Sequence, residues 1–106
     1  MSAELIAKLR VQCDGPRDGA LLRFSLGNAL LGDGDAAAAA DELRRAVVFD
    51  PAYSAAWKLL GKASLALGDT EQAAIAWQQG IEAARLRGDK QAEKEMGVFL
   101  RRLQPK

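Results

Sequence analysis

The sequence repeats itself at an interval of 34 residues. Residues 20–53 align with residues 54–87 without a gap. Most matched positions carry small or aliphatic side chains, and the identical pairs are Leu26/Leu60, Gly27/Gly61, Ala29/Ala63, Leu31/Leu65, Gly34/Gly68, Asp35/Asp69, Ala39/Ala73 and Ala40/Ala74. A fixed period of this length is typical of chains that stack one supersecondary unit on the next.

Each unit predicts two α-helices joined by a tight turn. The apolar residues of the first unit recur at helical spacing, at Leu22, Leu26, Ala29 and Leu30, then at Ala39, Leu43, Ala46 and Val47. Gly-Asp pairs at 34–35 and 68–69 stand between the helices: glycine can take the positive φ that ends one, and aspartate can accept hydrogen bonds from the free N–H groups of the next. Between the units, Pro51 is tolerated only in the first turn of a helix.

The expected fold is therefore all-α. We expect six helices, at about 3–12, 19–32, 36–49, 53–67, 70–86 and 90–103. The last of the paired helices should run to about Leu86 without a sharp stop, because Arg85 stands where a second proline would otherwise fall.

The segments "LLRFSLGNALLGDGDAAAAADELRRAVVFDP" and "AAWKLLGKASLALGDTEQAAIAWQQGIEAA" resemble two tetratricopeptide repeats, a family of 34-residue helix-turn-helix units. The first carries Leu26, Gly27, Leu30, Gly34, Asp35, Ala39, Leu43, Ala46 and Pro51 at the family's signature positions, and the second carries Trp57, Leu60, Gly61, Gly68, Asp69, Ala73 and Trp77. The departures are Arg23 and Ser64 in place of aromatic residues, Gly80 in place of alanine and Arg85 in place of proline.

The 106 residues suffice for one domain, which we divide into an N-terminal cap (1–18), repeat 1 (20–53), repeat 2 (54–87) and a C-terminal capping helix (88–106). Two stacked units alone would each leave an apolar face open, so the flanks should cover them. The first flank places Leu5, Ile6 and Leu9 on one side of a short helix, and the last places Ala92, Met96, Phe99 and Leu103 at helical spacing. This last helix should stack like the first helix of a third unit.

Catalysis is disfavoured by what the chain lacks. It contains no histidine and one cysteine, Cys13, so neither an internal disulfide nor a Cys-His nucleophilic pair can form. Zinc-site, nucleophile-elbow and phosphate-loop patterns are all missing. "GDGD" at 32–35 suggests a calcium loop, but the closing glutamate is not at the required spacing, so we interpret it as a helix cap. We expect no catalytic residues, no metal and no cofactor.

The charge balance does not favour a polyanionic partner. Fifteen lysines and arginines face 14 acidic residues, a net charge of +1, so we expect neither nucleic acid nor a membrane as partner. A local excess begins at Arg85, where seven cations including Arg85 face three anions; we interpret it as a solvated helix face. The N-terminus lacks the apolar core of a signal peptide, and no stretch reaches the roughly 20 apolar residues that span a bilayer. We expect a cytoplasmic protein.

Peptide binding is the function that the resemblance implies. In this family the first helices of successive units line a concave groove, and the residues turned away from the packing face are Phe24, Asn28, Leu31, Lys58, Lys62 and Leu65. Part of this set is similar to the family's carboxylate clamp, with Phe24 and Leu59 standing where a basic residue and an asparagine are usual. We expect a protein or peptide partner with an acidic or C-terminal carboxylate group. The two lysines, taken as exposed and unpacked, also fit simple solvation.

Self-association into a homodimer is the alternative. Met96, Val98, Phe99 and Leu100 favour it, because Val98 and Leu100 fall off the apolar face of the last helix and would otherwise meet water. In that case the chain would be a structural module without a separate peptide ligand.

Overall fold

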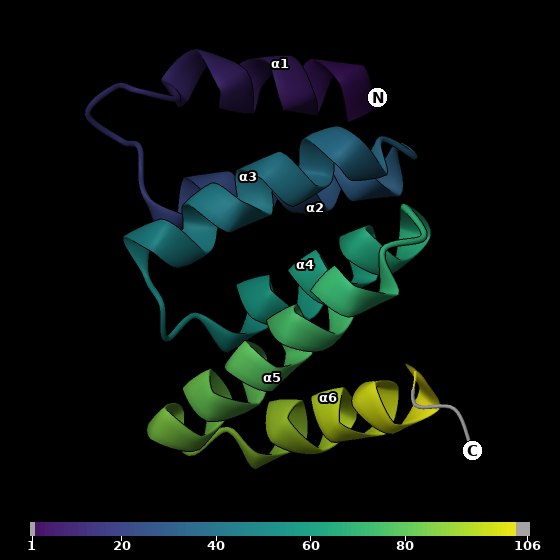
Figure 1. Ribbon diagram of the computed structural model, residues 1–106. Helices are drawn as coiled ribbons and strands as arrows, with labels where there is room; N and C mark the ends of the chain where they lie inside the picture. The colour runs from purple at the N-terminus through teal and green to yellow at the C-terminus, as the bar shows by residue number, and fades with distance from the viewer. Residues whose placement is uncertain (1, 104–106) are drawn as a thin grey trace.

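Six α-helices follow one another in the computed structural model, which describes residues 2–103 (Figure 1). They are α1 (Ser2–Gln12), α2 (Ala20–Gly32), α3 (Ala36–Phe49), α4 (Ser54–Ala66), α5 (Thr70–Arg87) and α6 (Lys90–Leu103). The all-α expectation is confirmed, and the predicted bounds agree within one residue at each end. Met1 and residues 104–106, including Lys106 of the predicted basic tail, lie outside the described residues.

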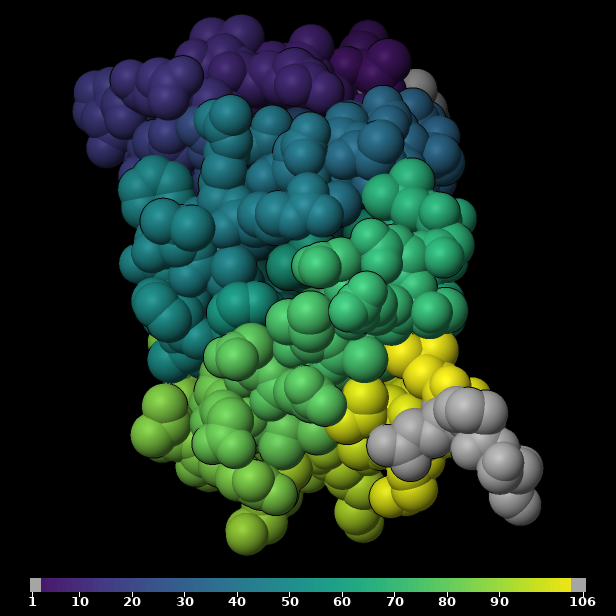
Figure 2. Space-filling model, in the orientation of Figure 1, coloured from purple at the N-terminus to yellow at the C-terminus, as the bar shows by residue number. Residues whose placement is uncertain are grey.

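The helices stack in chain order. α2 packs against α3 and α4 against α5 as two hairpins, and α3 packs on α4 to join them. α1 covers α2 at one end, and α6 packs on α5 and also reaches α4 at the other (Figure 1). Consecutive segments therefore form consecutive layers along a body 44 Å long (Figure 2). The position of α6 is the one predicted for the first helix of a third unit.

The Gly-Asp pairs end one helix and begin the next. Gly34 and Gly68 have φ of 87° and 80°, the left-handed conformation that glycine adopts without strain. Asp35 accepts a hydrogen bond from the Ala38 N–H at 3.1 Å, and Asp69 accepts one from the Gln72 N–H at 3.0 Å. Both residues thus act as helix N-caps, and the capping interpretation of "GDGD" is confirmed for Asp35.

A third Gly-Asp pair ends α5. Gly88 has φ of 71°, and the Asp89 side chain accepts a hydrogen bond from the Ala92 N–H at 3.1 Å. The helix ends at Arg87, one residue beyond the prediction, and its end is sharp. The expectation of a gradual end was wrong, because a glycine supplies the stop that proline supplies after the first unit.

Close approach of the paired helices depends on glycine in the first helix of each hairpin. A Cβ on Gly27 would lie 2.6 Å from Cγ of Leu43, and a Cβ on Gly61 would collide with the Trp77 ring. Leu43 and Trp77 are 34 residues apart, as the two glycines are, and both are buried. The same contact therefore forms in both hairpins and lets a large side chain lie directly on the backbone of its partner helix.

Arg23 is buried in a cluster of carboxylates. The sequence did not predict this cluster, because Arg23 stands at a position that is usually aromatic in this family. Its side chain is 4% exposed. It donates two hydrogen bonds to Asp18, from Nε at 2.9 Å and from Nη2 at 2.7 Å, and one to Glu42 Oε1 at 2.7 Å. A longer contact of 3.3 Å reaches Asp14. Arg23 thus joins the α1–α2 loop to α3, and its hydrogen bonds hold the pKa of Asp18 well below the usual range.

The flanking helices cover the ends of the stack in part as predicted. In α6, Ala92 and Met96 are buried, and Phe99 and Leu103 pack beside them. In α1, Ile6 and Leu9 pack on the first core, whereas Leu5 is 50% exposed. The assignment of Leu5 to the packing face was wrong, because α2 is the one helix that α1 contacts within the described residues, and Ile6 and Leu9 make the contacts with the core there.

Gly61→Ala should destabilise the protein by about 1–3 kcal/mol, because the methyl group overpacks the contact with Trp77. Gly97→Ala is the matched control: a Cβ there has nothing within 4 Å, so the better helix former should raise stability by up to about 1 kcal/mol. Urea unfolding followed by circular dichroism measures both. Equal effects of the two substitutions would contradict this account of the packing.

Asp18→Asn should lower the midpoint of thermal unfolding at neutral pH and flatten its acid dependence. The folded-state pKa of Asp18 is depressed, so its contribution is complete above the unfolded value of about 4 and is lost as pH falls below it. Thermal melts between about pH 7 and 2 should show the two proteins converging in acid. Asp33→Asn removes a carboxylate from an exposed turn residue and is the matched control; at neutral pH it should lower the midpoint less than Asp18→Asn does.

Candidate functional site

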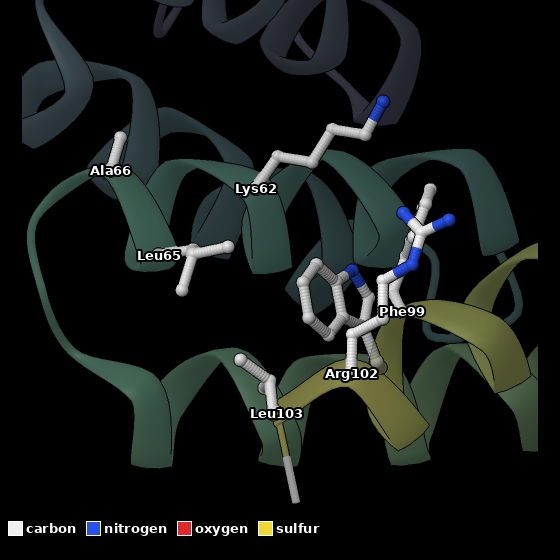
Figure 3. Close-up of a pocket in the computed structure, with 7 residues that line it drawn as sticks. Lys62, Leu65, Ala66, Phe99, Arg102 and Leu103 are labelled. Carbon is white, nitrogen blue, oxygen red and sulfur yellow. The ribbon is translucent and has the colours of Figure 1, made fainter.

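An apolar pocket of about 410 Å³ lies between α4 and α6. The side chains that line it come from three helices: Lys62, Leu65 and Ala66 of α4, Trp77 of α5, and Phe99, Arg102 and Leu103 of α6 (Figure 3). It exists because α6 packs mainly on α5 and makes only a limited contact with α4. The C-terminal halves of α4 and α6 therefore form two walls over α5.

Two aromatic rings give the pocket a rigid apolar interior. The rings of Trp77 and Phe99 lie 5.2 Å apart between centroids, at an interplanar angle of 46°. This tilted arrangement is favourable for an aromatic pair. The Trp77 indole N–H also donates a hydrogen bond to the Lys58 carbonyl at 3.0 Å, so the one polar group of the ring is satisfied away from the pocket. An apolar side chain entering the pocket would meet carbon on most sides.

Two cations stand at one side of this pocket. Lys62 Nζ lies 5.3 Å from the centroid of the Phe99 ring, a cation–π contact. In Figure 3 the charged ends of Lys62 and Arg102 both lie toward Phe99, whereas Leu65, Ala66 and Leu103 surround the other side. Both cations are exposed, and neither has an acidic partner within 4.0 Å among residues 2–103. The pocket therefore combines an apolar end with a positively charged end.

Lys58 has a different role from Lys62, although both were predicted to be exposed and unpacked. Its Nζ donates to Glu95 Oε1 of α6 at 2.7 Å, and the two side chains are 30% and 38% exposed. The hydrogen bond from Lys58, helped by one from Gln91, lowers the pKa of Glu95. The prediction was wrong for Lys58, because α6 brings a carboxylate beside it. Lys62, one turn further along α4, stays exposed.

The predicted groove residues of α2 do not reach the pocket. Phe24 is half-buried and packs against Tyr53, with ring centroids 5.0 Å apart, so the expectation that it turns away from the packing face was wrong. Leu31 is half-buried against the first core, and Asn28 is exposed. Of the six predicted residues, Lys62 and Leu65 come together at the pocket, and Lys58 lies next to them in the ion pair.

The contribution of α6 to this site was not predicted from the sequence. Leu103 was assigned to packing alone, Phe99 to packing and to the alternative homodimer surface, and Arg102 to a solvated face. The signal was present in their spacing, because an arginine at i+3 from Phe99 and next to Leu103 lies at the edge of the apolar face. The pocket that this edge borders is set by the way α6 crosses α4. That crossing depends on contacts between residues far apart in the sequence.

Three further features of residues 2–103 concern a thiol, metal-binding groups and membrane spans. Burial raises the pKa of the Cys13 thiol, whose Sγ lies 3.7 Å from the Leu9 carbonyl, so little nucleophilic thiolate forms at neutral pH. Within residues 2–103 no three His, Cys, Asp or Glu side chains are grouped to hold a metal ion. In the same range no helix has the length and apolar character needed to cross a membrane.

Comparison with known proteins establishes the family. No protein-family model matches the sequence. The chain is 60% identical over 86 residues to the TPR repeat-containing protein PA0015 of Pseudomonas aeruginosa, a match that covers 81% of this chain and 82% of the relative. The chain therefore belongs to the tetratricopeptide-repeat family.

Solved structures of the same fold agree with this assignment. The solution structure of protein BPP2914 from Bordetella parapertussis is similar with a TM-score of 0.79 and 44% identity, covering 93% of this chain and 86% of that one. The Sgt2 TPR domain from Aspergillus fumigatus gives a TM-score of 0.70 and 26% identity, with coverage of 99% and 74%. Tetratricopeptide-repeat domains are generally protein–protein interaction modules and are typically non-catalytic.

Lys58→Glu should lower the midpoint of thermal unfolding, because it places a second carboxylate against Glu95 where an ion pair now ties α4 to α6. Lys62→Glu should lower the midpoint less, since Lys62 makes no direct ion pair among residues 2–103 and loses only its cation–π contact with Phe99 and a weaker attraction to Glu95. Differential scanning fluorimetry compares the two. A double variant, Lys58→Glu with Glu95→Lys, should recover part of the loss.

Proposed function

We propose that this chain is a non-catalytic interaction module that binds a peptide segment of a partner protein along the first helices of its repeats. One apolar side chain of the peptide enters the pocket between α4 and α6, and an acidic group lies beside Lys62 and Arg102. The observation that carries this proposal is the pocket itself, an apolar hollow with cations on one side only.

The pocket is large enough to hold one bulky apolar side chain of a peptide. Its volume of about 410 Å³ lies toward the lower end of the range for ligand sites, and it is open on one side. Burial of an apolar side chain against Trp77 and Phe99 would supply the hydrophobic part of the affinity. The position of the pocket, walled by α4 and α6, continues the surface of first helices that this family uses for peptides.

The charges specify the chemistry of the bound segment. A carboxylate held beside Lys62 and Arg102 would gain charge-assisted hydrogen bonds, and arginine can bind it in a bidentate way. Lys58 contributes less to this attraction than the sequence predicted, since Glu95 already neutralises it. The carboxylate can be a side chain or a chain terminus, and both are within the acidic class that we propose.

The rest of the peptide would extend from the pocket over α4 toward α2. There Asn28 is exposed and can offer an amide to the peptide backbone, while Leu31 presents part of its side chain. Phe24 would act indirectly by supporting this surface from its packed position against Tyr53. These residues of α2 are proposed as secondary contacts, and the pocket is proposed as the anchor.

Binding can be tested with a panel of short peptides that alternate leucine with glutamate, against matched peptides that alternate leucine with lysine. Each is made with a free and with an amidated C-terminus. Trp77 lines the pocket, so its fluorescence should report occupancy. The acidic peptides should bind and the basic ones should not. Failure of every acidic peptide, in both terminal forms, would contradict the proposal.

Arg102→Glu should weaken binding of the acidic peptide at least about tenfold, the cost of losing one charge-assisted hydrogen bond. Arg101→Glu is the matched control, since it makes the same change of charge at the neighbouring exposed residue that does not line the pocket. Isothermal titration at fixed salt compares them. Equal losses in both variants would point to long-range attraction instead of contact in the pocket.

A further inference from the structure

A second hollow, of about 430 Å³, lies between α5 and α6 and is lined mainly by charged side chains. Its lining residues are Ile81 and Arg85 of α5, and Lys90, Glu93, Lys94, Gly97 and Arg101 of α6. Four of these residues are cations and one is a carboxylate. The hollow shares no residue with the pocket proposed for peptides, so the two sites can be tested separately.

Three of the cations follow one line along α6. Lys90, Lys94 and Arg101 stand at i, i+4 and i+11, so they share one face of the helix, and all three are exposed. These three residues are called the cationic stripe here. Gly97, at i+7, lies between Lys94 and Arg101 in the same stripe. Solvation alone explains why the cations are exposed, but not why they line one hollow.

The acidic side chains in and beside α6 are already engaged. Glu93 pairs with Arg85 at 2.8 Å, and Glu95 pairs with Lys58 at 2.7 Å. Asp89 caps the first turn of the helix. The cationic stripe therefore has no carboxylate within 4.0 Å among residues 2–103. Its positive charge is left without a counter-charge from this part of the chain.

The energetics of a helix disfavour this placement of charge. Lys90 begins α6, where the positive end of the helix dipole opposes a cation. Lys94 follows at i+4, a spacing at which like charges repel. Local rules of this kind are broken mainly at functional sites. An anion in the hollow would offset both unfavourable terms.

Gly97 is an independent indication of a ligand. Glycine inside a helix is unfavourable relative to alanine. At Gly27 and Gly61 a neighbouring side chain occupies the space of the missing Cβ, whereas a Cβ at Gly97 would meet nothing within 4 Å. Packing within the chain therefore does not require this glycine. Its effect is to leave the hollow open down to the helix backbone, where a ligand can approach closely.

The apolar side of α6 offers much less to a partner. Met96 is fully buried, and Val98, Phe99 and Leu100 are half-buried, so little apolar area remains on the surface that the sequence suggested for a homodimer. What α6 exposes beside this hollow is charge.

We propose that the hollow between α5 and α6 binds a phosphate monoester, and we call it the phosphate site (Arg85, Lys90, Lys94, Gly97 and Arg101). A phosphate monoester carries about −1.5 to −2 charges at neutral pH and presents three acceptor oxygens. A single carboxylate would neutralise less of the charge and accept from fewer of the donors.

The lining residues divide the work of binding. Lys94 and Arg101 stand on the two sides of Gly97 and donate to the phosphate oxygens, with arginine able to donate two parallel hydrogen bonds. Lys90 adds attraction from the start of the helix. Arg85 contributes less, because Glu93 already pairs with it. The carbon side of the ester lies against Ile81, which is half-buried in the wall of the hollow.

Titration with ethyl phosphate at about pH 8, where the ester is a dianion, tests the proposal. Chemical shifts of the backbone amides report binding, with ionic strength held constant by sodium chloride. The signals of residues 90–101 should shift most. Ethanesulfonate, a monovalent oxyanion of similar size, is the matched control ligand and should bind at least about tenfold more weakly.

Three variants locate the site. Lys94→Gln should weaken ethyl phosphate binding about tenfold, whereas Lys8→Gln, the same change at an exposed lysine of α1, should leave it unchanged. Gly97→Leu alters no charge but fills the hollow, so it should weaken binding at least about tenfold while the melting temperature stays at or above that of the parent.

Three results would overturn the proposal. The first is the absence of shifts in residues 90–101 up to about 20 mM ethyl phosphate. The second is equal binding of ethyl phosphate and ethanesulfonate, which would remove the preference for a dianion. The third is an equal loss of affinity in Lys94→Gln and Lys8→Gln, which would indicate long-range attraction instead of contact in the hollow.

Discussion

The stack depends on one contact that forms twice, in which a glycine of the first helix lies beneath a large side chain of the second. Gly27 receives Leu43 and Gly61 receives Trp77, and no Cβ fits at either glycine without movement of the side chain above it. Because the backbones approach so closely, alanines suffice to fill the rest of the interface, and Ala39 is fully buried. The two helices of each hairpin therefore lie close together. The differences between the two hairpins come from residues that depart from this pattern.

Two such departures change the molecule, one in each hairpin. Arg23 replaces the aromatic that Trp57 supplies in the second hairpin, and it gathers Asp18 and Glu42 around a buried guanidinium. This cluster connects the α1–α2 loop to the first hairpin through charge-assisted hydrogen bonds. An aromatic ring at the same position would have made only apolar contacts. Ser64, which replaces the aliphatic Leu30, does the opposite by removing contacts from the interior.

The last helix decides the character of the candidate site. As a cover for α5, α6 needs only its apolar face of Ala92, Met96, Phe99 and Leu103. The polar edge of α6 determines the charges at the site, since Glu95 neutralises Lys58 and Arg102 lines the pocket. Two lysines one turn apart on α4 thus have different surroundings, and the difference arises in a helix more than 30 residues further along the chain.

The sequence by itself determined the helices, their turns and the family. Periodic apolar residues, glycines that can take positive φ and aspartates that cap the next helix act within a few residues of one another, so their consequences can be derived locally. Only the tertiary structure decided that Arg23 is buried, that Phe24 packs on Tyr53 and that Lys62, Leu65 and Arg102 border one pocket. Those outcomes depend on the angles at which helices distant in sequence cross. The charge or size of a side chain does not reveal which residue of another helix will lie next to it.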